Sequence, residues 1–84
     1  YQPADVRAAS GETVQFMVKA TGENLKYQWQ YSNNGGQYWG NSSSEGATTD
    51  TLTVTMYAYR AGQMYRCVIT NGTETIISNV GTLF

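Results

Sequence analysis

The sequence predicts an all-β fold in which two antiparallel sheets pack face to face as a sandwich. Apolar and polar residues alternate over short runs, and clusters of Gly, Asn, Ser and Thr separate the runs. No stretch repeats its apolar residues with the 3.6-residue period of a helix. About seven such runs fit into the chain, which is typical of a β-sandwich with Greek-key connections.

The 84 residues are enough for one small domain with one core. We therefore expect residues 1–84 to form a single domain. The chain has no initiator Met and no signal-peptide pattern, and we expect it to be a piece excised from a longer multidomain protein.

The first strands follow from alternation between turns. Residues 5–9 come shortly after Pro3 and predict an edge strand, where a missing N–H is tolerated. Residues 13–19 alternate, and residues 25–31 have an apolar side chain at every odd position. The run from Ser32 to Gly36 ends that strand.

The second half of the chain begins with a long connection, predicted at residues 40–50 because apolar residues are scarce there. Alternation resumes at 51–56 and, after a corner at 57–62, at 64–70. Asn71-Gly72 is a strong hairpin signal, and it leads into a last strand at 75–84. The inward positions of these strands give a predicted core: Val14, Phe16, Val18, Tyr27, Trp29, Leu52, Val54, Tyr65, Cys67 and Ile69.

Trp29 on the third strand and Tyr65 two residues before Cys67 resemble the arrangement of immunoglobulin domains. The tyrosine of that arrangement normally returns its hydroxyl to the backbone of the preceding corner. Phe16 stands thirteen residues before Trp29, where the partner cysteine would be, so the usual disulfide is missing. We expect the Phe16 ring to fill its volume against Trp29 and Cys67. The fold class is therefore an immunoglobulin-like β-sandwich without a disulfide.

More closely, the chain resembles the immunoglobulin-like (Ig-like) repeat domains of bacterial cell-surface and secreted proteins. The residues that carry this resemblance are Gly11–Val14, Tyr27–Gln30, the Gly35-Gly36 turn followed by Trp39, Gly46–Thr49, Leu52–Val54 and Tyr65–Val68. The resemblance implies a stalk, spacer or cell-adhesion module outside the cell or at the cell wall, in contact with neighbouring domains of the same chain. A phage structural protein carrying a similar decoration domain is an alternative.

Few residues are candidates for chemistry. Cys67 is the only cysteine, and without any histidine to act as base we expect an inert buried thiol, with no catalytic residue and no enzyme activity. Residues 32–39 match the spacing of the Asp-box hairpin of sialidase-like propellers, with Asn34 in place of the Asp. We expect a structural hairpin; the alternative is a glycan- or host-protein-binding platform made by Tyr38 and Trp39 with Tyr31. Tyr57 and Tyr59 either pack locally or contact a neighbouring domain.

Composition excludes other classes. The net charge is −1 and the five basic residues are scattered, so nucleic-acid binding is not expected. No apolar run approaches the roughly 20 residues of a membrane-spanning helix. The acidic residues sit singly on separate turns, so we expect no metal and no cofactor. We expect the isolated domain to be a monomer.

Overall fold

The computed structural model describes residues 5–20, 22 and 24–84. These residues form seven strands and one short 3-10 turn within an elongated body of 38 × 24 × 20 Å. Their bounds are β1 Thr13–Met17, β2 Lys26–Ser32, β3 Gly40–Asn41, β4 Thr51–Thr55, η1 Ala58–Arg60, β5 Met64–Thr70, β6 Thr75–Ile77 and β7 Gly81–Thr82.

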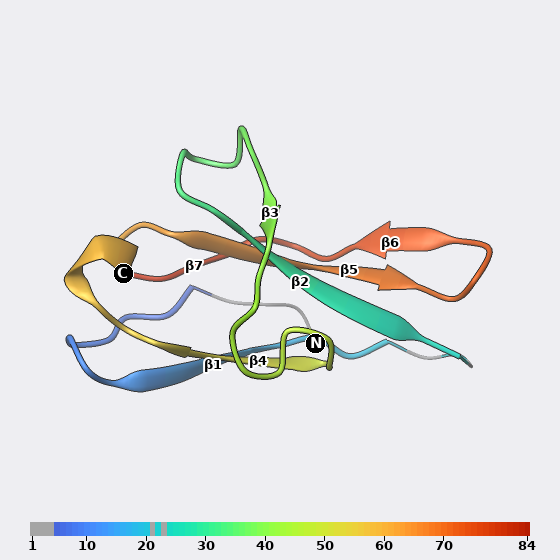
Figure 1. Cartoon of the computed structure of the whole chain (residues 1–84), viewed down its shortest axis with the longest axis horizontal. Helices are drawn as coiled ribbons and strands as arrows, with labels where there is room; N and C mark the ends of the chain where they lie inside the picture. The colour runs from blue at the N-terminus through green and yellow to red at the C-terminus, as the bar shows by residue number, and fades with distance from the viewer. Residues whose placement is uncertain (1–4, 21, 23) are drawn as a thin grey trace.

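The strands form two antiparallel sheets that face each other (Figure 1). The smaller sheet pairs β1 with β4, and the larger one has the order β3-β2-β5-β6, with β7 also paired to β5. The chain crosses between the sheets from β1 to β2, from β3 to β4 and from β4 to β5, which is the Greek-key type of connection. The predicted all-β sandwich of about seven strands, with no disulfide, is confirmed.

The core lies between the sheets and is built from alternate residues of each strand. Trp29 on β2 and Cys67 on β5 are register partners, and both are fully buried. Of the ten residues expected in the core, eight are buried, while Val14 and Tyr27 are partly buried and pack against the others. The buried hydrophobic residues are Phe16, Val18, Trp29, Ala47, Leu52, Val54, Met56, Tyr65, Cys67, Ile69 and Leu83.

The Phe16 ring lies in the same buried cluster as Trp29 and Cys67, and it packs on the Tyr65 ring with centroids 4.9 Å apart. One expectation about the core differs from the structure. The Tyr65 hydroxyl does not return to the corner backbone; it donates to Oε1 of Gln63. The long amide side chain of Gln63, two residues before the tyrosine, supplies the acceptor instead.

Predicted strand 64–70 is confirmed as β5, whereas three other predicted stretches differ. The long connection at 40–50 begins with a two-residue strand, β3, which pairs with the end of β2 and is also held by a 3.1 Å hydrogen bond from the Gln30 Nε2 to the Asn41 Oδ1. The edge segment 5–9 forms one parallel bridge, from Val6 to Leu83, because the Asp5 carboxylate rather than a backbone carbonyl accepts the Thr82 N–H.

The last predicted strand is split into β6 and β7 by a bulge. Ser78 causes it: its hydroxyl accepts the Cys67 N–H at 2.8 Å and donates to the Asn79 carbonyl at 2.9 Å. The Ser78 hydroxyl thus takes the place of a backbone acceptor in the ladder. The segment between β6 and β7 has one residue more than the part of β5 that it faces.

The connection from β3 to β4 ties the two sheets together along one side. Trp29 makes three hydrogen bonds to it: its backbone N–H donates to Ala47, its indole Nε1 donates to the Thr49 carbonyl, and its carbonyl accepts from Ser42. The Thr53 N–H of β4 donates to the Glu45 carbonyl at 2.8 Å. The connection therefore holds one wall of the site described next.

Candidate functional site

The segment 32–39 folds as a hairpin tip held from within by two polar side chains. The Ser32 hydroxyl accepts the Gly36 N–H and donates to the Asn34 Oδ1, each at 2.9 Å. The same Oδ1 accepts the Tyr38 N–H at 3.0 Å. Gly35 and Gly36 have φ of 76° and 90°, in the region that favours glycine. The polar groups of this motif are thus engaged in holding the turn.

Trp39 folds back over the outer face of β5. Its Nε1 donates to the Gly36 carbonyl at 3.0 Å, and the Arg66 guanidinium lies 4.2 Å from the centroid of its ring. Arg66 is fixed in turn by a 2.9 Å hydrogen bond from its Nε to Gln30. One face of the indole is therefore covered by a cation.

Tyr31, Tyr38 and Trp39, the residues of the alternative binding platform, do not share one face of the sheet. Tyr31 is the register partner of the buried Tyr65, so it lies on the inner face of the sheet, while Trp39 lies on the outer face with Arg66. Tyr38 is 74% exposed at the hairpin tip. The three residues point to different surroundings.

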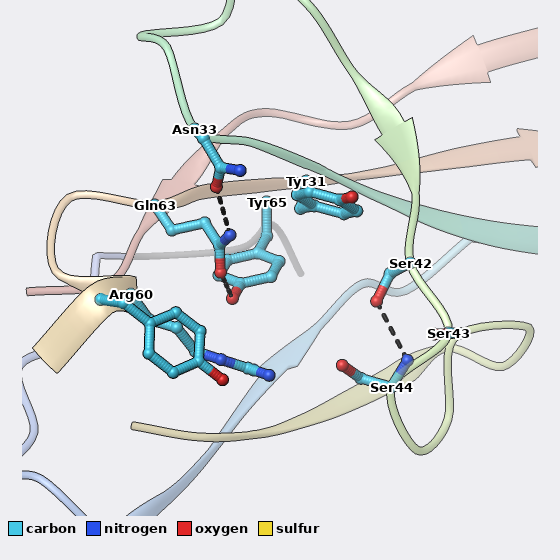
Figure 2. A pocket seen from close by; sticks show the side chains of 9 residues that line it. Tyr31, Asn33, Ser42, Ser43, Ser44, Arg60, Gln63 and Tyr65 are labelled. Atoms are coloured by element: carbon cyan, nitrogen blue, oxygen red, sulfur yellow. Dashed lines mark hydrogen bonds between the residues drawn. The ribbon is translucent and has the colours of Figure 1, made fainter. Parts of the chain in front are cut away.

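A hollow of about 610 Å³ opens instead between the sheets, beside the η1 corner (Figure 2). The end of β2, the segment after β3, the η1 turn and the start of β5 each contribute to it. The residues that line it are Tyr31, Asn33, Ser42, Ser43, Ser44, Tyr59, Arg60, Gln63 and Tyr65.

A chain of hydrogen bonds organises one wall of the hollow. The Tyr65 hydroxyl donates to Gln63, whose Nε2 donates to the Asn33 Oδ1 (Figure 2). On the opposite wall the Ser42 Oγ accepts the Ser44 N–H at 3.2 Å. Burial raises the pKa of Tyr65, an effect that the Arg60 charge partly offsets, so this hydroxyl is neutral at neutral pH. The walls therefore present neutral donors and acceptors.

Arg60 supplies the charge. It is the only charged residue among the described residues that line the hollow, and its side chain points into the hollow from the η1 turn (Figure 2). Its guanidinium carbon lies 5.7 Å and 5.5 Å from the ring centroids of Tyr57 and Tyr59, which stack on each other. Its Nε is buried and has no hydrogen-bond partner among the described residues.

The Arg60 guanidinium is positively charged at neutral pH. Burial acts to lower the pKa of the guanidinium, but Tyr59 and Tyr65 raise it by more, and the net direction is upward. Arg60 also borders a smaller hollow of about 340 Å³, which Glu45 lines on the side of β4. The Arg60 guanidinium thus borders two hollows. The described residues that line the smaller one include the carboxylate of Glu45, whereas those that line the larger one include no carboxylate.

Cys67 has the surroundings of a packed thiol. It is fully buried opposite Trp29, and burial raises its pKa to about 11. A thiol of this kind is protonated at neutral pH and is a poor nucleophile. Over the part of the chain that the structure describes, no three His, Cys, Asp or Glu side chains gather to hold a metal ion. Within the same residues, no helix has the length and apolar character to cross a membrane.

No model of a known protein family matches the sequence, and no curated protein matches it. The structure shows two features of this chain: an antiparallel β-sandwich and a polar recess that Arg60 lines. Sequence patterns single out Tyr31 in this recess but not Arg60, Gln63 or the serines. The only signals in the sequence are the run Ser42–Ser44 and the aromatic residues before Arg60, and neither says that the two segments meet.

Proposed function

We propose that this chain is a non-catalytic Ig-like module of a bacterial extracellular or surface protein, where it acts as a stalk or spacer domain. The observation that carries the proposal is the course of the chain at its two ends. The first described segment and the last strand run parallel, joined by the Val6–Leu83 bridge. Three backbone hydrogen bonds hold them: Val6 to Thr82, Ala8 to Phe84, and Phe84 to Val6.

Parallel terminal segments suit a module threaded in line with its neighbours. A chain that enters and leaves in the same direction carries on past the domain without turning back. The 38 Å long axis then adds to the reach of the whole protein. The resemblance to bacterial surface repeats supports the location outside the cell.

The use of the reactive side chains supports a non-catalytic role. Cys67 is buried with a raised pKa, and Ser32 is 1% exposed and bonded within the hairpin. Catalysis needs a nucleophile within reach of a base, and the sequence contains no histidine. The Cys67 thiol and the Ser32 hydroxyl therefore have structural roles, in core packing and in the hairpin.

Small-angle X-ray scattering of two copies joined from Phe84 to Tyr1 tests the in-line arrangement. We expect a maximum dimension close to twice the 38 Å axis of one domain. The single 84-residue chain, measured in parallel, supplies the reference. A two-copy protein that is little longer than the single domain would mean that the chain folds back, and the spacer proposal would fail.

A second candidate function, a binding module, is favoured by the hollow beside η1. The hairpin gives it less support, because Arg66 covers one face of Trp39 and Tyr38 stands alone at the tip. A binding role for the hollow is compatible with a place in a stalk, since none of the residues that line the hollow belongs to the paired terminal segments.

A further inference from the structure

We propose that the hollow beside η1 binds one acidic sugar residue, with the sugar carboxylate on Arg60 and the sugar hydroxyls on the neutral polar walls. The inference does not depend on the spacer role, and either can fail without the other. It rests on the charge, the wall chemistry and the size of the hollow.

The charge of the hollow fits a ligand with one negative group. Arg60 is the only charged residue among the described residues that line it, and Tyr59 and Tyr65 are its neighbours there. A guanidinium presents a planar fork of donors that matches a carboxylate with two hydrogen bonds. A ligand with several phosphates would bring more negative charge than one cation balances.

The walls fit a ligand with many hydroxyls. Three tyrosines and three serines supply hydroxyl groups that can both donate and accept hydrogen bonds. Asn33 and Gln63 supply side-chain amides, which also contain both donors and an acceptor. The Tyr65–Gln63–Asn33 hydrogen bonds hold one wall in place before any ligand arrives. A peptide carboxylate would place apolar side chains against this polar wall, which disfavours peptides as ligands.

The size of the hollow fits a sugar residue and its linkage neighbour. Its volume of about 610 Å³ falls within the range of roughly 300–1,000 Å³ typical of small-ligand sites. The rings of Tyr31 and Tyr59, which line the hollow, supply apolar surface for the C–H groups of a pyranose. An anionic monosaccharide therefore uses each kind of surface that the hollow provides.

Titration of the ¹⁵N-labelled chain with monosaccharides, followed by amide chemical shifts, tests the proposal. The probes are glucuronate, galacturonate and N-acetylneuraminate, with glucose and acetate as matched neutral-sugar and carboxylate-only probes. We expect at least one acidic sugar to shift the amides of residues 42–44 and 59–65, with a dissociation constant in the range of about 1–10 mM. Glucose and acetate should bind at least about tenfold more weakly.

Arg60→Gln should weaken acidic-sugar binding by at least about tenfold, because a hydrogen-bonded ion pair is lost. Arg7→Gln is the matched control: it removes the same charge and a similar cation–π contact, with Phe84 at 5.3 Å, outside the hollow. Its binding should equal that of the parent chain. The dispersed amide spectrum of each variant reports whether it is folded, and Arg60→Lys, which keeps the charge, should retain part of the affinity.

Three outcomes would overturn the proposal. One is the absence of shifts around the hollow with any acidic sugar at about 50 mM. Another is binding that Arg60→Gln and Arg60→Lys both leave unchanged. The third is acetate or a short peptide with a free carboxyl terminus binding as tightly as the acidic sugar, which would remove the sugar from the assignment.

Discussion

At the scale of single residues, packing and hydrogen bonds hold the two sheets together without a disulfide. Cys67 lies fully buried opposite Trp29, and the Phe16 and Tyr65 rings meet at 4.9 Å between the sheets. A cross-link in a small domain contributes about 2–5 kcal/mol. Here aromatic contact, buried area and the Trp29 hydrogen bonds hold the sheets together instead.

The buried thiol makes the stability of the domain depend on pH. Burial raises the pKa of Cys67 from 9.0 to about 11. Between these values the unfolded chain releases the thiol proton while the folded chain keeps it, so the free energy of unfolding falls as pH rises. A shift of this size corresponds to roughly 2–3 kcal/mol lost by pH 11. Burial of Tyr65 adds a fall of the same sign.

Urea unfolding at several pH values, followed by tryptophan fluorescence, measures this dependence. Cys67→Ala is the comparison, because it removes the titrating group from a site that is otherwise the same. We expect the curve of the variant to fall less steeply than that of the parent between pH 9 and 11. Two parallel curves would contradict a raised thiol pKa.

At the scale of elements, the connection between β3 and β4 is shaped by one glycine. Gly46 has φ of 80°, and a Cβ at this position would overlap the carbonyl oxygen of Thr51. The Thr49 hydroxyl donates to the carbonyls of Gly46 and Thr51 in the same turn. Only glycine permits both the left-handed conformation and the close approach of the two backbone segments at this position.

Gly46→Ala should therefore destabilise the domain by about 3 kcal/mol or more, since it combines left-handed strain with a backbone clash. Gly35→Ala is the matched control: Gly35 has φ of 76°, but a Cβ there meets nothing within 4 Å. It should lose only about 1 kcal/mol. Chemical denaturation of the two variants compares the losses directly, and equal losses would mean that the connection moves aside without cost.

How well each element could be predicted depends on whether side chains or backbone define it. β5 follows from strict alternation around Tyr65 and Cys67, and the hairpin after it follows from Asn71-Gly72. β3 has two residues, and no alternating pattern can be seen in so short a run. The bulge at Ser78 depends on a serine hydroxyl that replaces a backbone acceptor. A serine in a strand does not by itself predict this hydrogen bond, so the sequence does not reveal the bulge.

The candidate site was the least predictable feature. Arg60, Gln63 and the serines at 42–44 come from three segments, and only the crossing of the chain between the sheets brings them to one hollow. The aromatic residues 31, 38 and 39 are close in sequence, yet the pleat of the strand and the hairpin send them to different faces. Proximity along the chain was a poor guide to proximity in the sandwich.

At the scale of the whole molecule, the terminal segments decide how the domain responds to tension. Neighbours in a stalk would pull the first segment and the last strand in opposite directions along their length. Because these two segments are parallel and joined by the bonds between Val6, Ala8, Thr82 and Phe84, the pull shears the bonds together instead of opening them one by one. A spacer domain built in this way should resist extension as one cooperative unit.

Single-molecule force spectroscopy on a protein of several identical copies joined in line tests whether the terminal segments make the domain resist extension as one unit. Forced unfolding reports the barrier that the sheared segments present. We expect a regular series of force peaks, each followed by an extension of roughly 260 Å as one 84-residue domain is released from its folded length of 38 Å. A smooth extension without resolved peaks would contradict it.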